Sequence, residues 1–224
     1  VAAHVPNAPS LTALDHRIAM SYAVAGLATE SGLSIDDIRP IETIAGDDEF
    51  AEVFMDDVRV PMTNLVSDLH NGWRVANALL AHERLGTANP QLLFDALERV
   101  KKVARANGAL DDPYFRERLA EIEIDTVGFA AMFAHAAEIA NAERSLGLDA
   151  SIMKINGTET LQRLADLLLD AAGTDAALTG RVMTEDGPIE IAPLFLQVRR
   201  ATIYGGSSEI QRNILAKRVL GLPS

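Results

Sequence analysis

The sequence predicts a mainly α-helical fold, an up-and-down helical bundle preceded by a few β-strands from an incomplete β domain. Three observations predict it. Apolar residues make up 48% of the 224 residues and aromatic residues only 5%, so alanine and leucine supply a core suited to closely packed helices. After residue 72, apolar side chains recur three and four residues apart, as in amphipathic helices. Before residue 61, short runs broken by Gly, Asp and Pro are typical of strands.

The N-terminal part of the chain predicts two strands. Residues 1–14 are rich in Pro and Ala, which is typical of a linker. The segments "LSIDDIRPI" and "FAEVFMDDVRVP" are expected to be strands, whereas "AMSYAVAGLA" fits either a strand or a short helix. We therefore expect residues 1–67 to be a β-domain remnant with an N-terminal linker, and residues 68–224 to be a helical bundle domain.

The first predicted helices follow Asn71-Gly72. Pro90 is expected to kink or interrupt the helix that begins with "GWRVANALLAHERLG", because proline removes a helical hydrogen bond. The clearest apolar stripe comes after Pro113. Its members are Leu119, Ile122, Thr126, Phe129, Phe133, Ala136 and Ala140. Their alternating spacing of three and four residues predicts one long bundle helix.

A second long helix is predicted in "LQRLADLLLDAAG", with Leu161, Leu164 and Leu168 on one face and an end at Gly173. Residues 174–192 contain the turn sequence "TEDGP" and are expected to form a loop. Helix is expected to resume near Leu194.

The closing segment, "ATIYGGSSEIQRNILAKRVLGLPS", contains a Gly-Gly step before a predicted helix. Glycine permits positive φ and a close approach to the main chain. Ser207 and Ser208 are typical of a helix start, and Gly221 and Pro223 of its end. The apolar stripe of this helix is expected at Ile210, Ile214, Leu215 and Val219. A helix N-terminus suits an anion or a polar ligand, and a tight turn without a ligand is the alternative.

Composition excludes several classes of function. The net charge is −12 with the acidic residues spread along the chain, so no basic patch for nucleic acid is expected. The absence of cysteine excludes disulfides, thiolate catalysis and cysteine-based metal sites. No apolar run approaches the roughly 18 residues of a membrane span, and the N-terminus lacks the pattern of a secretory signal. We therefore expect a soluble, cytoplasmic protein without nucleic-acid or membrane partners.

Glu83 is a candidate catalytic carboxylate. The pair His82-Glu83 resembles the start of a zinc-binding helix, but position 86 is Gly and the five histidines show no ligand spacing, so no metal site is expected. Glu83 neighbours the apolar stripe of its helix. A partly buried carboxylate there would have a raised pKa and could take a proton near neutral pH. A solvated glutamate on the flank of a helix is the alternative.

Two long blocks of the sequence resemble the acyl-CoA dehydrogenase family. The first, "FAEVFMDDVRVPMTNLVSD" with "NGWRVANALLAHERLG", is similar to the last strands of that family's middle β domain and the entry into its C-terminal helical domain. The second, "IYGGSSEIQRNILAKRVLGLP", is similar to the family's closing signature, and "MKINGTETLQRLADLLLDAAG" fits the intervening helix less specifically. The resemblance implies an FAD-dependent enzyme that oxidises acyl-CoA thioesters to trans-2-enoyl-CoA and passes electrons to an electron-transfer flavoprotein.

The resemblance also implies a catalytic base. Many members carry a glutamate directly after the tyrosine of the closing signature, where this chain has Gly205. Another branch carries its base in a Glu-Arg step of the first C-terminal helix, which matches Glu83-Arg84. The resemblance therefore implies that Glu83 removes the α proton, while the backbone N–H of Gly205 donates to the thioester oxygen.

The same match implies the binding residues. Gly206, Ser207 and Glu209 would contact the flavin nucleotide. Tyr204 would belong to the substrate site, and Arg84 would steady the base or touch CoA. Family members assemble through these C-terminal helices, so a homo-oligomer, a dimer or a tetramer, is expected.

The chain departs from the family pattern in ways that leave other readings open. The Arg-x-x-Phe-Gly stretch that usually contacts FAD across the subunit interface is absent from "ARANGALDDPYFRERLA". The family's N-terminal helical domain and most of its β domain are missing, and the start at Val1 indicates a fragment, so this chain alone is expected to be inactive. The alternative is a non-catalytic structural or oligomerisation subunit of a heteromeric complex. An acyl-CoA oxidase is a third reading.

Overall fold

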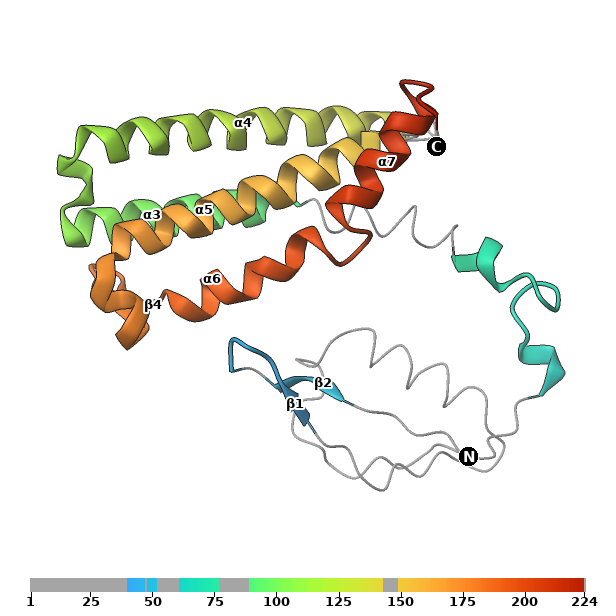
Figure 1. Ribbon diagram of the computed structural model, residues 1–224, viewed down its shortest axis with the longest axis horizontal. Helices are drawn as coiled ribbons and strands as arrows, with labels where there is room; N and C mark the ends of the chain where they lie inside the picture. The colour runs from blue at the N-terminus through green and yellow to red at the C-terminus, as the bar shows by residue number, and fades with distance from the viewer. Residues whose placement is uncertain (1–39, 47, 52–60, 77–88, 143–148, 224) are drawn as a thin grey trace. The chain divides into compact units, whose positions relative to one another are not determined.

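A computed structural model of the protein describes residues 40–46, 48–51, 61–76, 89–142 and 149–223 (Figure 1). The chain divides into two compact units, Val1–Val75 and Ala76–Ser224. No helix in the described ranges is long and apolar enough to cross a membrane. The boundary expected between residues 67 and 68 stays a prediction.

The first unit contains an antiparallel β-hairpin. Strand β1 (Pro40–Glu42) pairs with β2 (Asp48–Ala51), with Ile41 opposite Phe50. Each strand overlaps one of the two runs in which the sequence predicts a strand. The rest of those runs, and "AMSYAVAGLA", lie outside the described residues. A 3₁₀ turn, η2 (Met62–Asn64), follows, and residues 72–76 are helical.

The second unit is the predicted up-and-down bundle. Helices α3 (Pro90–Asn107), α4 (Pro113–Asn141) and α5 (Asp149–Thr179) run back and forth, and α6 (Ala192–Arg199) and α7 (Ser208–Arg218) complete it (Figure 1). Helix α5 packs against each of the other four. The mainly α fold class is therefore confirmed, and α5 is the element on which the closing segment is assembled.

Pro90 starts a helix. It is the first residue of α3, where a missing N–H costs nothing. The Asn89 side chain caps this helix by accepting from the backbone N of Gln91 at 2.9 Å. Gly108, in the left-handed conformation with φ 75°, ends it. The expected interruption at Pro90 is thus confirmed, and the short helix η3 (Ala109–Asp111) leads into α4.

The apolar stripe of α4 faces the core, as its spacing predicts. The buried members are Leu119, Ile122, Thr126, Phe129 and Ala136. Phe133 is partly buried against the same core, and the side chain of Ala140 lies outside the described residues. Thr126 is accommodated because its hydroxyl donates to the carbonyl of Ile122 at 2.8 Å.

A glycine allows α4 and α5 to pack closely. A Cβ at Gly157 on α5 would lie 2.8 Å from the ring of Phe129, which is fully buried. We expect Gly157→Ala to lower the free energy of unfolding by about 1–3 kcal/mol because the ring has nowhere to move. Gly128→Ala on α4 is the matched control. Its Cβ meets nothing within 4 Å, so it should raise helix stability by up to about 1 kcal/mol. Urea unfolding of both variants checks this. Changes of the same sign in the free energy of unfolding of the two variants would contradict the packing argument.

The expected loop at residues 174–192 is wrong. Helix α5 bends at Gly173, with φ 72° and ψ −176°, but resumes and ends at Thr179. Strands β3 (Arg181–Thr184) and β4 (Gly187–Glu190) then form a hairpin, whose turn is the "TEDGP" sequence. The bend is stabilised by Asn107, whose side-chain amide donates to the carbonyls of Ala171 and Ala172 at 3.2 and 3.1 Å. Asn107 thus donates hydrogen bonds to two carbonyls at the bend, where the helix itself lacks backbone donors.

Candidate functional site

The Gly-Gly turn between α6 and α7 requires both of its glycines. Gly205 and Gly206 have φ values of 66° and 93°, a region that other residues adopt at a cost. A Cβ at Gly206 would come within 3.0 Å of the side-chain amide of Gln211. Among the described residues, no acceptor takes a hydrogen bond from the N–H of Gly205. Within the ranges that the structure describes, the turn therefore presents a backbone donor without an acceptor.

Gln211 fixes the turn to the body of the bundle. Its side chain is fully buried, and its Nε2 donates to the carbonyls of Gly205 and Gly206, each at 3.4 Å. Its Oε1 accepts from the Ser151 hydroxyl on α5 at 2.8 Å. One amide thus joins the start of α5, the first turn of α7 and the Gly-Gly turn.

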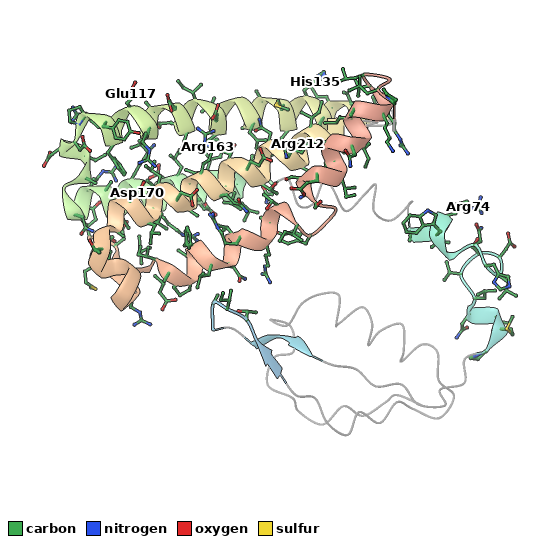
Figure 2. All side chains as sticks on the ribbon, viewed as in Figure 1. Arg74, Glu117, His135, Arg163, Asp170 and Arg212 are labelled. Carbon is green, nitrogen blue, oxygen red and sulfur yellow. The ribbon has the colours of Figure 1, made fainter. Side chains whose placement is uncertain are left out.

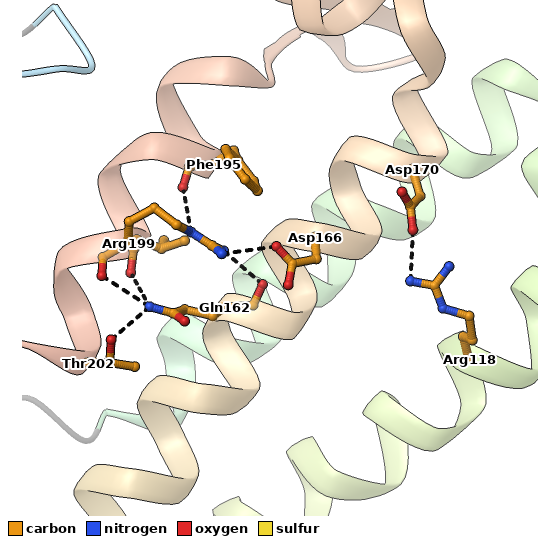
Figure 3. A network of polar contacts seen from close by, with 8 residues as sticks. Arg118, Gln162, Asp166, Asp170, Phe195, Arg199 and Thr202 are labelled. Atoms are coloured by element: carbon orange, nitrogen blue, oxygen red, sulfur yellow. Dashed lines mark hydrogen bonds and ion pairs between the residues drawn. The ribbon is translucent and has the colours of Figure 1, made fainter. Parts of the chain in front are cut away.

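A second network holds the segment before the turn. The side-chain amide of Gln162 on α5 donates to the hydroxyl of Thr202 at 3.0 Å and to the carbonyl of Arg199 at 3.1 Å (Figure 3). Arg199 in turn donates to the carbonyl of Gln162 at 3.1 Å, pairs with Asp166 at 3.1 Å and lies over the Phe195 ring at 4.3 Å. Helix α6 and the short helix η4 (Arg200–Thr202) are thereby fixed against α5.

The N-terminus of α7 is capped by its own residues. Ser207 is the N-cap and accepts from the backbone N of Ile210 at 3.4 Å. The exposed Glu209 accepts from Ser207 and from its own backbone N–H, which lowers the pKa of its carboxyl below the usual value. Further along α7, Arg212, which is labelled in Figure 2, pairs with Glu159 of α5 at 2.6 Å. The carboxylate at this end of α7 is therefore ionised near neutral pH.

Two buried polar groups lie where α5 and α7 meet. The Lys154 side chain on α5 is fully buried, and Ser208 at the start of α7 is 4% exposed. Neither the Nζ of Lys154 nor the Oγ of Ser208 has a hydrogen-bond partner among the described residues. Unpaired buried polar groups are costly and uncommon in proteins. They mark this junction as a place where an acceptor belongs.

Lys154 makes the stability of the protein depend on pH. Burial lowers the pKa of its ammonium from the usual 10.5, and the carboxylates of Glu209 and Glu159 oppose this only in part. The folded protein therefore binds this proton less tightly than the unfolded chain, and the free energy of unfolding rises with pH up to about 10.5.

We expect Lys154→Met to be more stable than the unmodified protein at pH 7, with an advantage that shrinks as the pH approaches 10.5. Urea unfolding of both proteins at a series of pH values measures this difference. A difference that is constant with pH would contradict the lowered pKa.

The structure brings five of the predicted site residues together. Tyr204, Gly205, Gly206, Ser207 and Glu209 form the turn and the first turn of α7. Glu83 and Arg84 lie outside the described residues, so their positions stay predictions. No group of three or more His, Asp or Glu side chains that could hold a metal occurs in the described part of the chain.

Sequence reasoning missed the polar face of α7. The stripe expected at Ile210, Ile214, Leu215 and Val219 is partly exposed, and the residues of this helix that are buried are Ser208 and Gln211. Their spacing of three residues puts them on one face. The signal for that face is the matching pair of polar residues on α5, Ser151 and Lys154, at the same spacing.

A family model and relatives that cover most of this chain indicate one family. The family model "Acyl-CoA dehydrogenase, C-terminal domain" matches residues 70–220. Acyl-CoA dehydrogenase IpdE1 of Mycolicibacterium smegmatis is 40% identical over 191 residues, 84% of this chain and 46% of that protein. IpdE1 of Mycobacterium tuberculosis is 40% identical over 190 residues, 83% of this chain and 47% of that protein. The chain therefore spans about half the length of the curated relatives it matches.

Solved structures give the same result. The Tcur3481-Tcur3483 steroid ACAD superposes with a TM-score of 0.71 at 26% identity, over 84% of this chain and 49% of that one. The ChsE4-ChsE5 complex from Mycobacterium tuberculosis superposes with a TM-score of 0.66 at 26% identity, over 84% of this chain and 49% of that one.

A short stretch has a different relative. It is 73% identical over 30 residues to 3-phosphoshikimate 1-carboxyvinyltransferase of Zymomonas mobilis, covering 13% of this chain and 7% of that enzyme. The dehydrogenase relatives leave part of the chain unmatched, and that part is long enough to hold this stretch. Since so little of the transferase is covered, the similarity carries no activity over to this chain.

Proposed function

The chain belongs to the acyl-CoA dehydrogenase family, and from that premise we propose that it supplies the C-terminal domain of an FAD-dependent enzyme that oxidises acyl-CoA thioesters to trans-2-enoyl-CoA. Glu83 is the base of that reaction. The observation that carries the proposal is the Gly-Gly turn, in which the N–H of Gly205 has no acceptor in the described part of the chain and which has no acid of its own.

The residues around the turn fit a flavin nucleotide. The N–H groups at the N-terminus of α7, which Ser207 caps, are donors suited to its polar and anionic parts. The carboxylate of Glu209 is an exposed acceptor suited to hydroxyl groups. Gly206, Ser207 and Glu209 are therefore assigned to FAD, which when bound accepts a hydride from the β carbon of the substrate.

The residues of this chain act at the α carbon and the thioester oxygen. The Glu83 carboxylate takes the α proton, and the electron pair of that C–H bond moves toward the thioester carbonyl. The Gly205 N–H donates to the carbonyl oxygen as negative charge develops there. A preorganised donor of this kind lowers the activation barrier by about 3–4 kcal/mol. Tyr204 and Arg84 are assigned to substrate binding, with Arg84 steadying the base or touching CoA.

The partners of the intact enzyme follow from the same assignment. An acyl-CoA thioester is the substrate, and an electron-transfer flavoprotein takes the electrons. Self-association through the bundle, as a dimer or a tetramer, is part of the proposal. It is supported by large apolar side chains exposed on α4, which are Tyr114, Ile124, Val127 and Met132.

A second candidate function is a non-catalytic subunit of a heteromeric complex. One solved relative is named the ChsE4-ChsE5 complex, and another carries the two-part name Tcur3481-Tcur3483. In that case the turn and α7 would serve packing rather than chemistry. Copurification of the native protein from its source separates the two cases, because a second, different acyl-CoA dehydrogenase-like chain in fixed ratio would favour the subunit reading.

Steady-state turnover of the full-length protein tests the proposed activity. The protein, loaded with FAD, is assayed with an electron acceptor dye and a panel of acyl-CoA thioesters. The panel includes a thioester with a steroid side chain, because a similar solved structure is named a steroid ACAD. Formation of the 2-enoyl-CoA product from any of them supports the proposal. No product from a flavin-loaded protein would contradict it.

A further inference from the structure

The polar junction between α5 and α7 contains a charge that the proposed chemistry does not use. Lys154 is completely inaccessible to solvent, although a lysine is rarely buried unless it is paired. Its ammonium has no hydrogen-bond partner among the described residues, and neither has the hydroxyl of Ser208. Two donors without acceptors in one junction indicate that the acceptor comes from outside the described fold.

The position of Lys154 follows from its neighbours. Ser151, one helical turn earlier on the same face of α5, donates to Gln211, and Gln211 donates to the Gly-Gly turn. Glu209, in the first turn of α7, is the carboxylate that acts most strongly on the ammonium, followed by Glu159. Lys154 therefore lies on the face of α5 that packs against the first turn of α7.

The neighbouring carboxylates do not neutralise Lys154. Glu209 is exposed, and its oxygens accept from Ser207 and from its own backbone N–H. Glu159 pairs with Arg212 at 2.6 Å. The buried side of the junction thus keeps an uncompensated positive charge, and the positive end of the α7 dipole adds to it.

We propose that Lys154 and Ser208 form an anion subsite beneath the N-terminus of α7, in which the buried ammonium is the counter-charge for a phosphate group of the bound dinucleotide. The identity of that ligand rests on the proposed FAD-dependent function, whereas the anion subsite itself does not. Because the ammonium is buried, it attracts the phosphate in a low-dielectric surrounding and is screened little by salt.

The test measures ligand affinity rather than turnover. The apo form of the full-length protein is titrated with FAD and, separately, with inorganic pyrophosphate. The variants are Lys154→Met, which keeps the length of the side chain, and Ser208→Ala. The matched control is Lys102→Met, which removes a partly exposed lysine that pairs with Asp186 on the β3–β4 turn.

We expect Lys154→Met to weaken the binding of FAD roughly ten- to a hundredfold, the effect of a hydrogen bond to a charged group. The loss should persist at high salt, and Lys102→Met should bind FAD normally. The melting temperature of the apo protein should stay the same or rise in Lys154→Met, because an unpaired buried charge has been removed. A merely structural lysine would lower the melting temperature and leave the affinity unchanged.

The other possible outcomes distinguish a failure of the anion subsite from a failure of the flavin proposal. Equal affinities of Lys154→Met and Lys102→Met for FAD would overturn the subsite while leaving the flavin proposal intact. If Lys154→Met does not fold, the test rests on Ser208→Ala. We expect this variant to bind FAD roughly three- to tenfold more weakly, and an unchanged affinity would overturn the subsite. If the protein binds pyrophosphate in a way that depends on Lys154 but binds no FAD, the anion subsite would stand and the flavin proposal would be overturned. Binding of neither ligand would overturn both.

Discussion

Glu83→Gln in the full-length protein is expected to lower turnover of an acyl-CoA thioester by about 10²–10⁴-fold, the usual cost of losing a general base. The amide has nearly the shape of the carboxylate but cannot take the α proton. Since Gly205 offers no side chain, the closing turn has no acid to replace it. Stopped-flow measurement of flavin reduction checks the chemical step directly.

The controls for Glu83→Gln separate the loss of the base from the loss of the fold. Glu121→Gln changes an exposed glutamate of α4 in the same way and should keep full activity. The flavin content of Glu83→Gln should equal that of the unmodified protein, because this residue is not assigned to the cofactor. Near-normal turnover in Glu83→Gln would remove it as the base.

Gly206→Ala is expected to lower the free energy of unfolding by about 2–4 kcal/mol. About half of this is the strain of an alanine at a φ of 93°. The rest arises because the new Cβ would lie within 3.0 Å of the Gln211 amide. That amide is buried and bonded at both ends, so moving it leaves polar groups unpaired, at about 1–3 kcal/mol.

Two further variants isolate the contact with Gln211. Gly108→Ala places an alanine at a similar φ of 75° with no contact closer than 3.6 Å, so it should cost only the strain, about 1 kcal/mol. Adding Gly206→Ala to Gln211→Ala should cost clearly less than Gly206→Ala alone, because the two groups are in contact. Equal costs for Gly206→Ala and Gly108→Ala, measured by urea unfolding, would show that the contact is unimportant.

The regular helices could be predicted because their apolar spacing matches the helical period. The stripe of α4 is buried as expected, and Pro90 and Ser207 begin helices or cap them. The continuation of α5 past Gly173 could not be predicted, because a glycine after a periodic run usually ends a helix. The bend of α5 is stabilised by Asn107, whose two carbonyl acceptors lie 64 and 65 residues further along the chain. A contact between residues so far apart leaves no local pattern in the sequence.

The candidate site could be predicted only in part. The glycines and serines of the turn are visible as local signals, but their attachment to the bundle is not. Gln211 and Ser151 are ordinary polar residues until the fold brings them within 2.8 Å. Lys154 would be placed on the surface by any pattern rule, since lysines are seldom buried. The assignment of Glu83 came from the resemblance, and the residues alone left it open.

Placing residues 1–67 in a β domain stays a prediction, and the hairpin β1–β2 is compatible with it. The short stretch shared with 3-phosphoshikimate 1-carboxyvinyltransferase covers 13% of this chain and carries no function over to it.

One measurement tests the central claim most directly, which is that this chain is the C-terminal domain of a flavin-dependent acyl-CoA dehydrogenase. The native full-length protein is purified from its source, and its visible absorption is recorded before and after anaerobic addition of an acyl-CoA panel. We predict an oxidised-flavin spectrum that bleaches on addition of the substrate, with no other reductant present. A native protein without flavin, or one whose flavin stays oxidised with every thioester, would contradict the claim.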